Sequence, residues 1–238
     1  MVLSANPSRL LEVPMLPQPT EETCGPTCLH AVYRYYGEEL DLNTLISEVN
    51  QVQTGGTLAV MLGNHALERG YRARIYTYNL TLFDPTWFEL DRQGLEDRLE
   101  RQREQKADPK LEYATQAYLR YLRLGGELLF EELTPELIIK HLNNGTPILT
   151  GLSATYLYRM VREIPGTNLG HDTLGEPVGH FVVISGYEEA HMVVADPLDQ
   201  NPLSPYSQQY AVRTTRLINA ILLGMVTYDA NLLIIEPK

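Results

Sequence analysis

Cys24 is the side chain in this sequence with the strongest case for nucleophilic chemistry. It follows a proline-rich loop and precedes apolar residues, between Leu29 and Tyr36, at the spacing of one helix face. Pro26 suits the first helical turn, and Gly37 suits the position just past the end. Unpaired N–H groups at a helix N-terminus carry partial positive charge, which favours a thiolate over a thiol.

Gln18 lies six residues before Cys24 and offers a side-chain amide that could reach back over the sulfur. A cysteine nucleophile beside an amide donor is half of an acyl-transfer site. Cys28 has no such donor at the same offset, only Glu22, and we expect it to be an ordinary core cysteine. Most single cysteines are core residues, so the argument for Cys24 depends on partners elsewhere in the chain.

A predicted β-hairpin supplies such partners, His180 and Asp196. Two apolar runs, 181–185 and 192–195, flank a turn between Gly186 and Ala190, so we expect antiparallel pairing. If the turn centres near Glu188, His180 lies opposite Asp196 to within about one residue. An acid beside a histidine orients the ring and fixes its tautomer.

Each of these two residues also has an ordinary interpretation. A histidine that opens a strand is often structural, and an aspartate before proline often forms a turn. With Cys24 and Gln18, however, they complete a set of nucleophile, base, orienting acid and oxyanion donor. His171 is the reserve histidine, in a loop that could line the cleft.

Composition limits the classes of function. The chain has 238 residues, 44% hydrophobic and 21% charged, with a net charge of −11. Such acidity argues against nucleic acid and against anionic membrane surfaces. We find no signal peptide and no run of about 20 apolar residues that would insert in a membrane. The two cysteines form neither a disulfide framework nor a zinc pattern, so we expect a cytoplasmic protein without metal or cofactor. The oligomeric state is left open.

The remaining pattern predicts an α+β fold in which most strands come late. Residues 1–13 are expected to be extended, 54–57 a loop and 153–177 irregular. Asp41 or Asn43 should cap the second helix, Thr57 the third, and Thr134 a later one. Predicted helices cover 24–36, 43–49, 58–69, two segments within 81–133 broken near Asp108-Pro109, 135–142 and 207–223. Predicted strands cover 71–80, 147–152, 181–185, 192–195 and 231–235.

Residues 81–133 differ from the rest in their density of charge. The run of Glu, Arg, Lys and Gln from Asp91 to Glu112 is typical of a solvated helix face. Gly125-Gly126 is expected to end the second helix of this segment as a C-cap, not to act as a self-cleavage site.

Four blocks of this sequence resemble the papain-like cysteine peptidases that process bacteriocin leaders after a double-glycine motif (the peptidase C39-like proteins). The resemblance covers most of 14–80 and 135–200. It includes no transporter segment, and the 81–133 insertion, the long 153–178 loop and the residues after 205 lie outside the compact family pattern. The blocks are Gln18, Cys24-Gly25-Pro26 with the helix ending Tyr35-Tyr36-Gly37, Gly179-His180-Phe181-Val182-Val183, and Ala195-Asp196-Pro197.

This resemblance implies a single papain-like domain over 1–238, with a helical half that carries the cysteine and an antiparallel sheet half. It implies Cys24 as nucleophile, His180 as base, Asp196 as orienting acid and Gln18 as oxyanion donor, acting on a peptide or protein substrate. Three functions stay open at this point: a thiol hydrolase, an acyl-transfer enzyme on the same site, or a catalytically silent peptide-binding module.

Overall fold

The structure is a computed structural model, and it describes residues 8–49, 57–167 and 169–238. Part of the predicted N-terminal arm and most of the predicted 54–57 loop lie outside these residues. The helices are α1 (Cys24–Tyr35), α2 (Leu42–Glu48), α3 (Ala59–Glu68), α4 (Arg92–Gln105), α5 (Pro109–Arg123), α6 (Pro135–Asn143), α7 (Ala154–Tyr158) and α8 (Thr214–Leu223), with two 3₁₀ turns, η1 (Pro85–Glu89) and η2 (Gly224–Thr227). The strands are β1 (Ser8–Leu10), β2 (Arg72–Thr77), β3 (Glu127–Leu129), β4 (Ile148–Ser153), β5 (Gly179–Glu188), β6 (His191–Ala195), β7 (Gln209–Arg213) and β8 (Asn231–Glu236).

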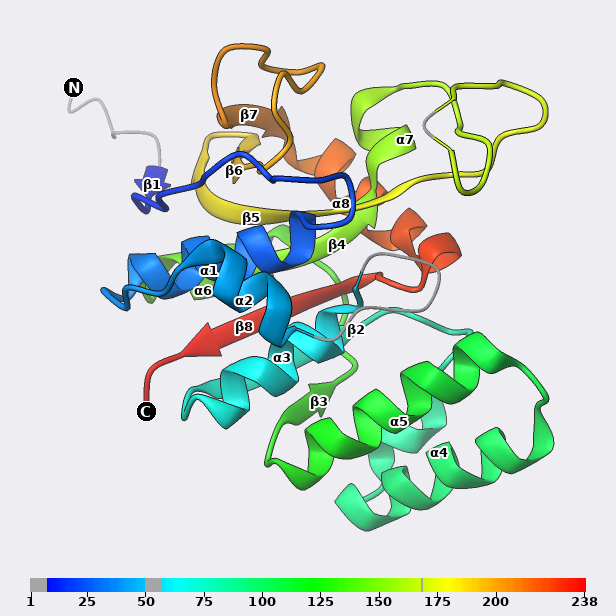
Figure 1. Ribbon diagram of the computed structural model, residues 1–238. Helices are drawn as coiled ribbons and strands as arrows, with labels where there is room; N and C mark the ends of the chain where they lie inside the picture. The colour runs from blue at the N-terminus through cyan, green and yellow to red at the C-terminus, as the bar shows by residue number, and fades with distance from the viewer. Residues whose placement is uncertain (1–7, 50–56, 168) are drawn as a thin grey trace, which may run out of the picture.

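One sheet organises these elements, in the order β3-β2-β8-β4-β5-β6-β7. Every pair is antiparallel except β2 with β3, and β1 adds to β5 beside Gly186. Figure 1 shows α1, α2 and α3 in front of the sheet, with α6 and α8 behind it. The α+β class is therefore confirmed.

Strand alternation explains how both faces are covered. Leu233 on β8 meets Gly63 of α3, whereas Tyr76, which pairs with Leu232, bonds His141 of α6. Neighbouring residues on a strand point to opposite faces, so α3 and α6 lie on opposite sides of the sheet. The strands between them, β4 and β8, are buried almost throughout.

The ends of the predicted helices agree with the capping signals in the sequence. Asp41 accepts from the Thr44 N–H at the start of α2, and Thr134 does the same for Leu137 in α6. Gly125 has a φ of +92°, and its N–H donates to Leu122. The Gly125-Gly126 pair is therefore a helix C-cap, as predicted.

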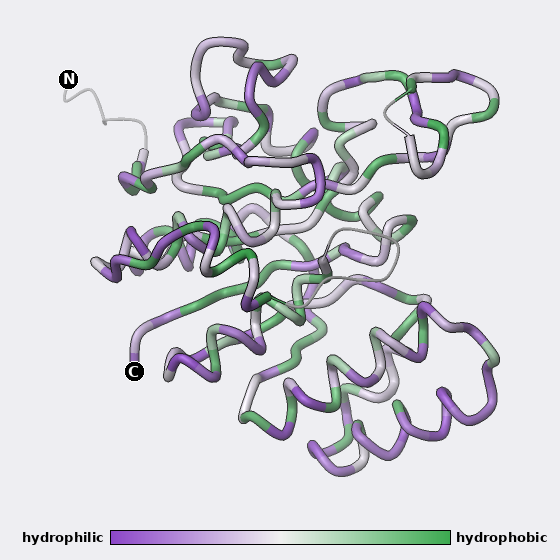
Figure 2. Tube along the Cα trace, in the orientation of Figure 1, coloured by the Kyte–Doolittle hydropathy of each residue, from purple (hydrophilic) through white to green (hydrophobic). Residues whose placement is uncertain are grey.

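Helices α4 and α5 form a hairpin at one end of the sheet, beside α3 and β3 (Figure 1). Only Leu95 and Leu99 of α4 are buried, and Figure 2 shows most of the trace of this helix in the purple of hydrophilic residues. The predicted solvated face is therefore present. Whether this hairpin and its flanks form an insertion at about 81–133 of a single domain stays a prediction.

Two predictions about the helices are wrong, one about where a helix begins and one about a cap. The expected helix over 207–223 begins only at Thr214, because residues 209–213 alternate exposed and buried and pair with β6 as β7. Thr57 does not cap α3, because the Ala59 N–H bonds the carboxylate of Asp229, which is 170 residues away in sequence. Two short elements, β3 and α7, were not predicted, and each has only three to five residues.

The buried Asp229 carboxyl makes the stability of the fold depend on pH. Burial raises its pKa to about 7, against the smaller lowering effect of the Ala59 N–H. Between its unfolded pKa near 4 and about 7, the folded state binds more protons than the unfolded state, so rising pH lowers stability.

The Asp229→Asn variant is therefore expected to have a higher free energy of unfolding than the parent at pH 8, by up to a few kcal/mol. At pH 4 the free energies of unfolding of the two proteins should differ little. Urea unfolding across pH 4–8 measures this difference. Asp41→Asn is a matched control with the opposite sign, because hydrogen bonds from Thr44 lower the pKa of Asp41. A difference between parent and Asp229→Asn that stays constant with pH would contradict the prediction.

Among the helices that the structure describes, none combines the length and the apolar character needed to cross a bilayer.

Candidate active site

Cys24 is the first residue of α1 and is 9% exposed. A turn of Thr20 and Thr23 precedes it, in which the Thr23 N–H and hydroxyl both donate to the Thr20 carbonyl. Thr23 therefore makes no side-chain cap, and the N–H groups of the first turn of α1 keep their partial positive charge near the sulfur. A Cβ on Gly25 would lie 2.4 Å from a Thr57 methyl, so glycine lets this turn pack closely.

The hairpin of β5 and β6 brings the predicted histidine and acid together. His180 Nε2 lies 2.9 Å from Asp196 Oδ1, with His180 8% exposed and Asp196 fully buried. This contact leaves Nδ1 as the ring nitrogen available to another group. The Cys24 thiol is one of the groups that raise the pKa of His180, which puts the cysteine near the histidine–aspartate pair.

The predicted hairpin register is wrong by about two residues. The strands pair Val183 with Ala195, so continuing the ladder would set His180 opposite Leu198. The turn centres between Glu189 and Ala190, one to two residues after the expected centre at Glu188, and β5 is irregular at Ser185. A shift of two residues keeps the same face of the sheet, which is why Asp196 still meets His180.

Besides the contact with His180, the Asp196 side chain accepts three hydrogen bonds, and its backbone N–H donates one more. Its Oδ2 accepts from Tyr158 Oη at 2.6 Å and Tyr210 Oη at 2.7 Å, and its Oδ1 accepts from the Leu198 N–H at 2.9 Å. The Asp196 N–H donates to Gln208. Both carboxylate oxygens are therefore fixed, which orients the imidazole.

The charges in this cluster support one another. Burial would lower the pKa of His180, but the negative charge and hydrogen bond of Asp196, with a smaller effect of Cys24, raise it well above its usual range. Burial favours the neutral acid of Asp196, yet His180 and Tyr158 hold its pKa low. These effects favour an imidazolium–carboxylate pair at His180 and Asp196.

Gln18 lies on the loop that leads to Cys24. Its backbone N–H donates to the Pro197 carbonyl at 2.8 Å, which ties it to the residue after Asp196. Its Nε2 donates to the Thr20 carbonyl at 3.0 Å, and its Oε1 is buried without a hydrogen-bond partner in the described structure. The structure thus brings Gln18 to the same cluster of loops, but it records no contact between Gln18 and Cys24.

A model of the Peptidase_C39 like family matches residues 10–89 and 110–216, which is most of the chain. The chain belongs to this family. The resemblance predicted from the four sequence blocks is therefore confirmed, and the protein is a cysteine peptidase. The residues between the two matched ranges, 90–109, include all of α4.

Solved structures similar to this peptidase include a putative C39-like peptidase from Bacillus anthracis, with 14% identity, 98% of this chain and 99% of that chain covered, and a TM-score of 0.56. A double glycine motif protease from an AMS/PCAT transporter, in complex with the leader peptide, is 13% identical, with 97% and 95% covered and a TM-score of 0.47. Xylellain, a cysteine protease from Xylella fastidiosa, is 13% identical, with 98% and 87% covered and a TM-score of 0.43. No curated protein matches the chain.

Cys28 and His171 do not belong to this site in the peptidase. Cys28 is fully buried, its thiol donates to the Phe181 carbonyl at 3.2 Å, and burial raises its pKa. Its role is to dock α1 on β5. His171 lies in the 159–178 loop, where its Nδ1 accepts from the Thr173 and Leu174 N–H groups.

The sequence did not indicate Tyr158 and Tyr210 as part of the site. Tyr158 ends the short helix α7, and Tyr210 is on β7, in a segment predicted to be helical. The alternation Tyr210-Ala211-Val212 was the available signal for a strand that points Tyr210 inward. Burial and the charge of Asp196 raise both phenol pKa values, so both stay protonated as donors.

Tyr158→Phe and Tyr210→Phe are each expected to lower the free energy of unfolding at pH 7 by about 1.5–3 kcal/mol, because each leaves a buried carboxylate short of one donor. Chemical denaturation measures this loss. Tyr156→Phe is the matched control, since that exposed phenol should cost less than about 0.5 kcal/mol. Equal stability of all three variants would show that the two phenols do not support Asp196.

Proposed function

We propose that this peptidase hydrolyses peptide bonds with Cys24 as nucleophile, His180 as acid and base, and Asp196 as the orienting acid. The observation that carries the proposal is the 2.9 Å contact between His180 and a fully buried, fourfold-bonded Asp196, at a site that also holds the Cys24 sulfur. A structural histidine would not need a carboxylate fixed on both oxygens.

The proposed reaction begins with the Cys24 thiolate paired with the His180 imidazolium. The sulfur attacks the substrate carbonyl carbon, and the carbonyl oxygen becomes an oxyanion. His180 then gives its proton to the leaving amine as the C–N bond breaks, which leaves an acyl enzyme. A water molecule, deprotonated by His180, attacks this thioester and releases the acid and the thiolate.

The oxyanion would be held by the Cys24 N–H at the start of α1 and by the Gln18 amide. The –NH₂ group of Gln18 has two donors, and Thr20 uses only one of them. A donor aimed at developing charge in a partly dry site contributes more than it would in water.

Gln18→Ala is expected to lower kcat by about 10²–10³ with little change in KM, because the lost hydrogen bond forms only as charge develops. Steady-state kinetics on a cleaved peptide measures this. Gln105→Ala, an exposed amide on α4, should leave kcat unchanged. A change in KM alone would show that Gln18 is not an oxyanion donor.

The proposal is tested by incubating the peptidase with a mixed peptide library that includes Gly-Gly sequences, and by reading new termini with mass spectrometry. New carboxyl termini that carry one ¹⁸O from labelled water are expected. Products that carry an added amine instead of water would identify acyl transfer. An unchanged library, together with an unreactive Cys24, would indicate a binding module.

A further inference from the structure

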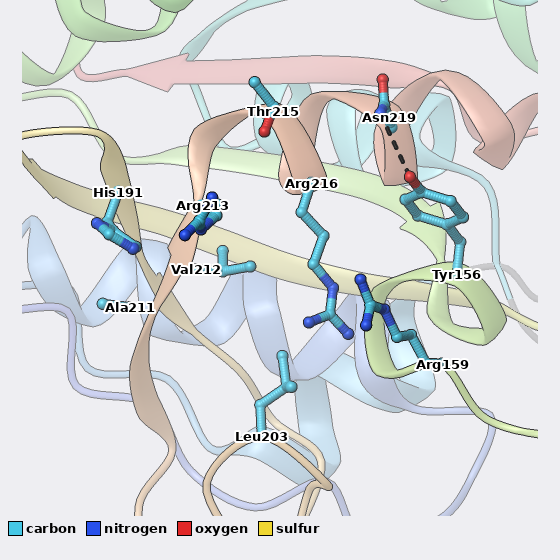
Figure 3. A pocket seen from close by; sticks show the side chains of 10 residues that line it. All are labelled: Tyr156, Arg159, His191, Leu203, Ala211, Val212, Arg213, Thr215, Arg216 and Asn219. Atoms are coloured by element: carbon cyan, nitrogen blue, oxygen red, sulfur yellow. Dashed lines mark hydrogen bonds between the residues drawn. The ribbon is translucent and has the colours of Figure 1, made fainter.

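A cavity outside the proposed active site is lined by residues of α7, β7 and α8. Its volume is about 520 Å³, within the range of small-molecule sites, and it opens between α7, β7 and α8 (Figure 3). None of the four proposed active-site residues lines it. The side chains that matter most here are Tyr156, Arg159, His191, Leu203, Arg213 and Arg216.

This cavity is strongly basic in an acidic protein. Three of the chain's 19 Lys and Arg residues line it, whereas none of its lining residues is Asp or Glu. Within residues 8–49, 57–167 and 169–238, no carboxylate forms an ion pair with Arg159, Arg213 or Arg216. Their charges are therefore left for solvent or for a ligand.

Two of these arginines converge. Figure 3 shows the guanidinium groups of Arg159 and Arg216 pointing toward one another across the cavity. The Nε–H of Arg216 is buried and has no hydrogen-bond partner among the described residues. Two like charges that point toward one another are unfavourable unless an anion lies between them, and a buried unbonded donor adds to that cost.

The backbone around the cavity also favours an anion. Thr215 and Arg216 line the cavity from the first turn of α8, and Arg213 lines it from the end of β7, directly before this helix. The helix has no side-chain cap. The Thr214 N–H donates to the Ala190 carbonyl, and the partial positive charge of the N–H groups that follow it in the first turn adds to that of the arginines. Arg159 ends α7 in a left-handed conformation, with a φ of 55°.

We propose that this cavity is a binding site for a small molecule that carries a multiply charged oxyanion, either phosphate or carboxylate. Arg159 and Arg216 hold the oxyanion, because a planar guanidinium bonds two oxygens at once. Tyr156 and Leu203 line the remaining space, which leaves room for a less polar part of the ligand. We refer to these residues as the anion pocket.

The anion pocket is adjacent in sequence to the supports of the active site. Arg159 follows Tyr158, and Ala211 follows Tyr210, so a ligand would contact the two segments whose phenols hold Asp196. The charge of Arg216 already acts on the Tyr210 phenol. The proposal itself concerns binding and does not depend on the proposed function.

Isothermal titration of the full chain with sodium pyrophosphate and with sodium citrate, at matched ionic strength, tests the site. Saturable binding at a 1:1 ratio is expected for at least one anion. Arg159→Gln and Arg216→Gln should each weaken it by at least about tenfold, since each removes charge-assisted hydrogen bonds. Arg101→Gln, an exposed arginine on α4, is the matched control and should bind like the parent.

A preference for pyrophosphate would assign phosphate as the ligand group, and a preference for citrate would assign carboxylate. Circular dichroism of each variant confirms that the fold is kept, which is expected because Arg159 is exposed. The proposal is overturned if neither anion binds saturably, or if Arg159→Gln and Arg216→Gln both bind as tightly as Arg101→Gln.

Discussion

Replacing Cys24 with alanine is expected to abolish peptide cleavage, with kcat falling by about 10⁴–10⁶. The variant keeps the helix, the His180–Asp196 pair and the fold, but no other described residue can form the acyl enzyme at that position. The loss should therefore appear in kcat, with substrate still bound. Cleavage rates with a defined peptide and binding of the same peptide to the variant measure the two effects separately.

Cys28→Ala is the matched control for this experiment. Cys28 lies one helical turn after Cys24 and is fully buried, so its removal leaves a small cavity and costs about 1–2 kcal/mol of stability. Activity should stay within about twofold of the parent, because its thiol faces the Phe181 carbonyl. If Cys28→Ala lost activity and Cys24→Ala kept it, the nucleophile would be wrongly assigned.

Asp196→Asn should have the second largest effect, a fall in kcat/KM of about 10³–10⁴. The amide carries an –NH₂ group, which only donates, where the carboxylate has only acceptors, and Tyr158 and Tyr210 both donate to that side chain. The side chain must then rotate or break a bond, and His180 loses the partner that fixes its tautomer. Steady-state kinetics against pH measures both consequences.

The pH dependence of Asp196→Asn has a defined sign. The charge of Asp196 raises the pKa of His180, so removing that charge lowers it. The thiolate–imidazolium pair then loses its proton at a lower pH, and the alkaline limb of kcat/KM should move to lower pH. Asp199→Asn, on the exposed loop three residues later, should leave the profile unchanged. An alkaline limb at the same pH in both variants would contradict the account.

Local signals in the sequence were sufficient to predict most helices and the central strands. Pro26 and Gly37 mark the two ends of α1, and Asp41 and Thr134 cap α2 and α6 as expected. The prediction of the α3 cap failed because it depends on a residue that is distant in sequence. The cap comes from Asp229, which is 170 residues from Ala59. No local pattern contains that information.

The sequence also predicted the main residues of the candidate site, but not the residues that support them. Cys24, His180 and Asp196 do come together, although the hairpin register was two residues off, because turn position and strand irregularities are not fixed by apolar pattern alone. The phenols of Tyr158 and Tyr210 were missed because they reach Asp196 from α7 and β7, and tertiary packing decides both elements. Because residues 207–223 were predicted to form a helix, the sequence did not indicate that Tyr210 points inward from a strand.

The central claim is that Cys24 and His180 form a thiolate–imidazolium pair, and the rate of Cys24 alkylation against pH tests it most directly. Iodoacetamide labelling, followed by peptide mass, distinguishes Cys24 from the buried Cys28 in the same sample. We predict rapid labelling of Cys24 well below the free-thiol pKa of about 8.5, and slower labelling in His180→Ala. Labelling that rises only near that pKa, and is the same in His180→Ala, would contradict the account.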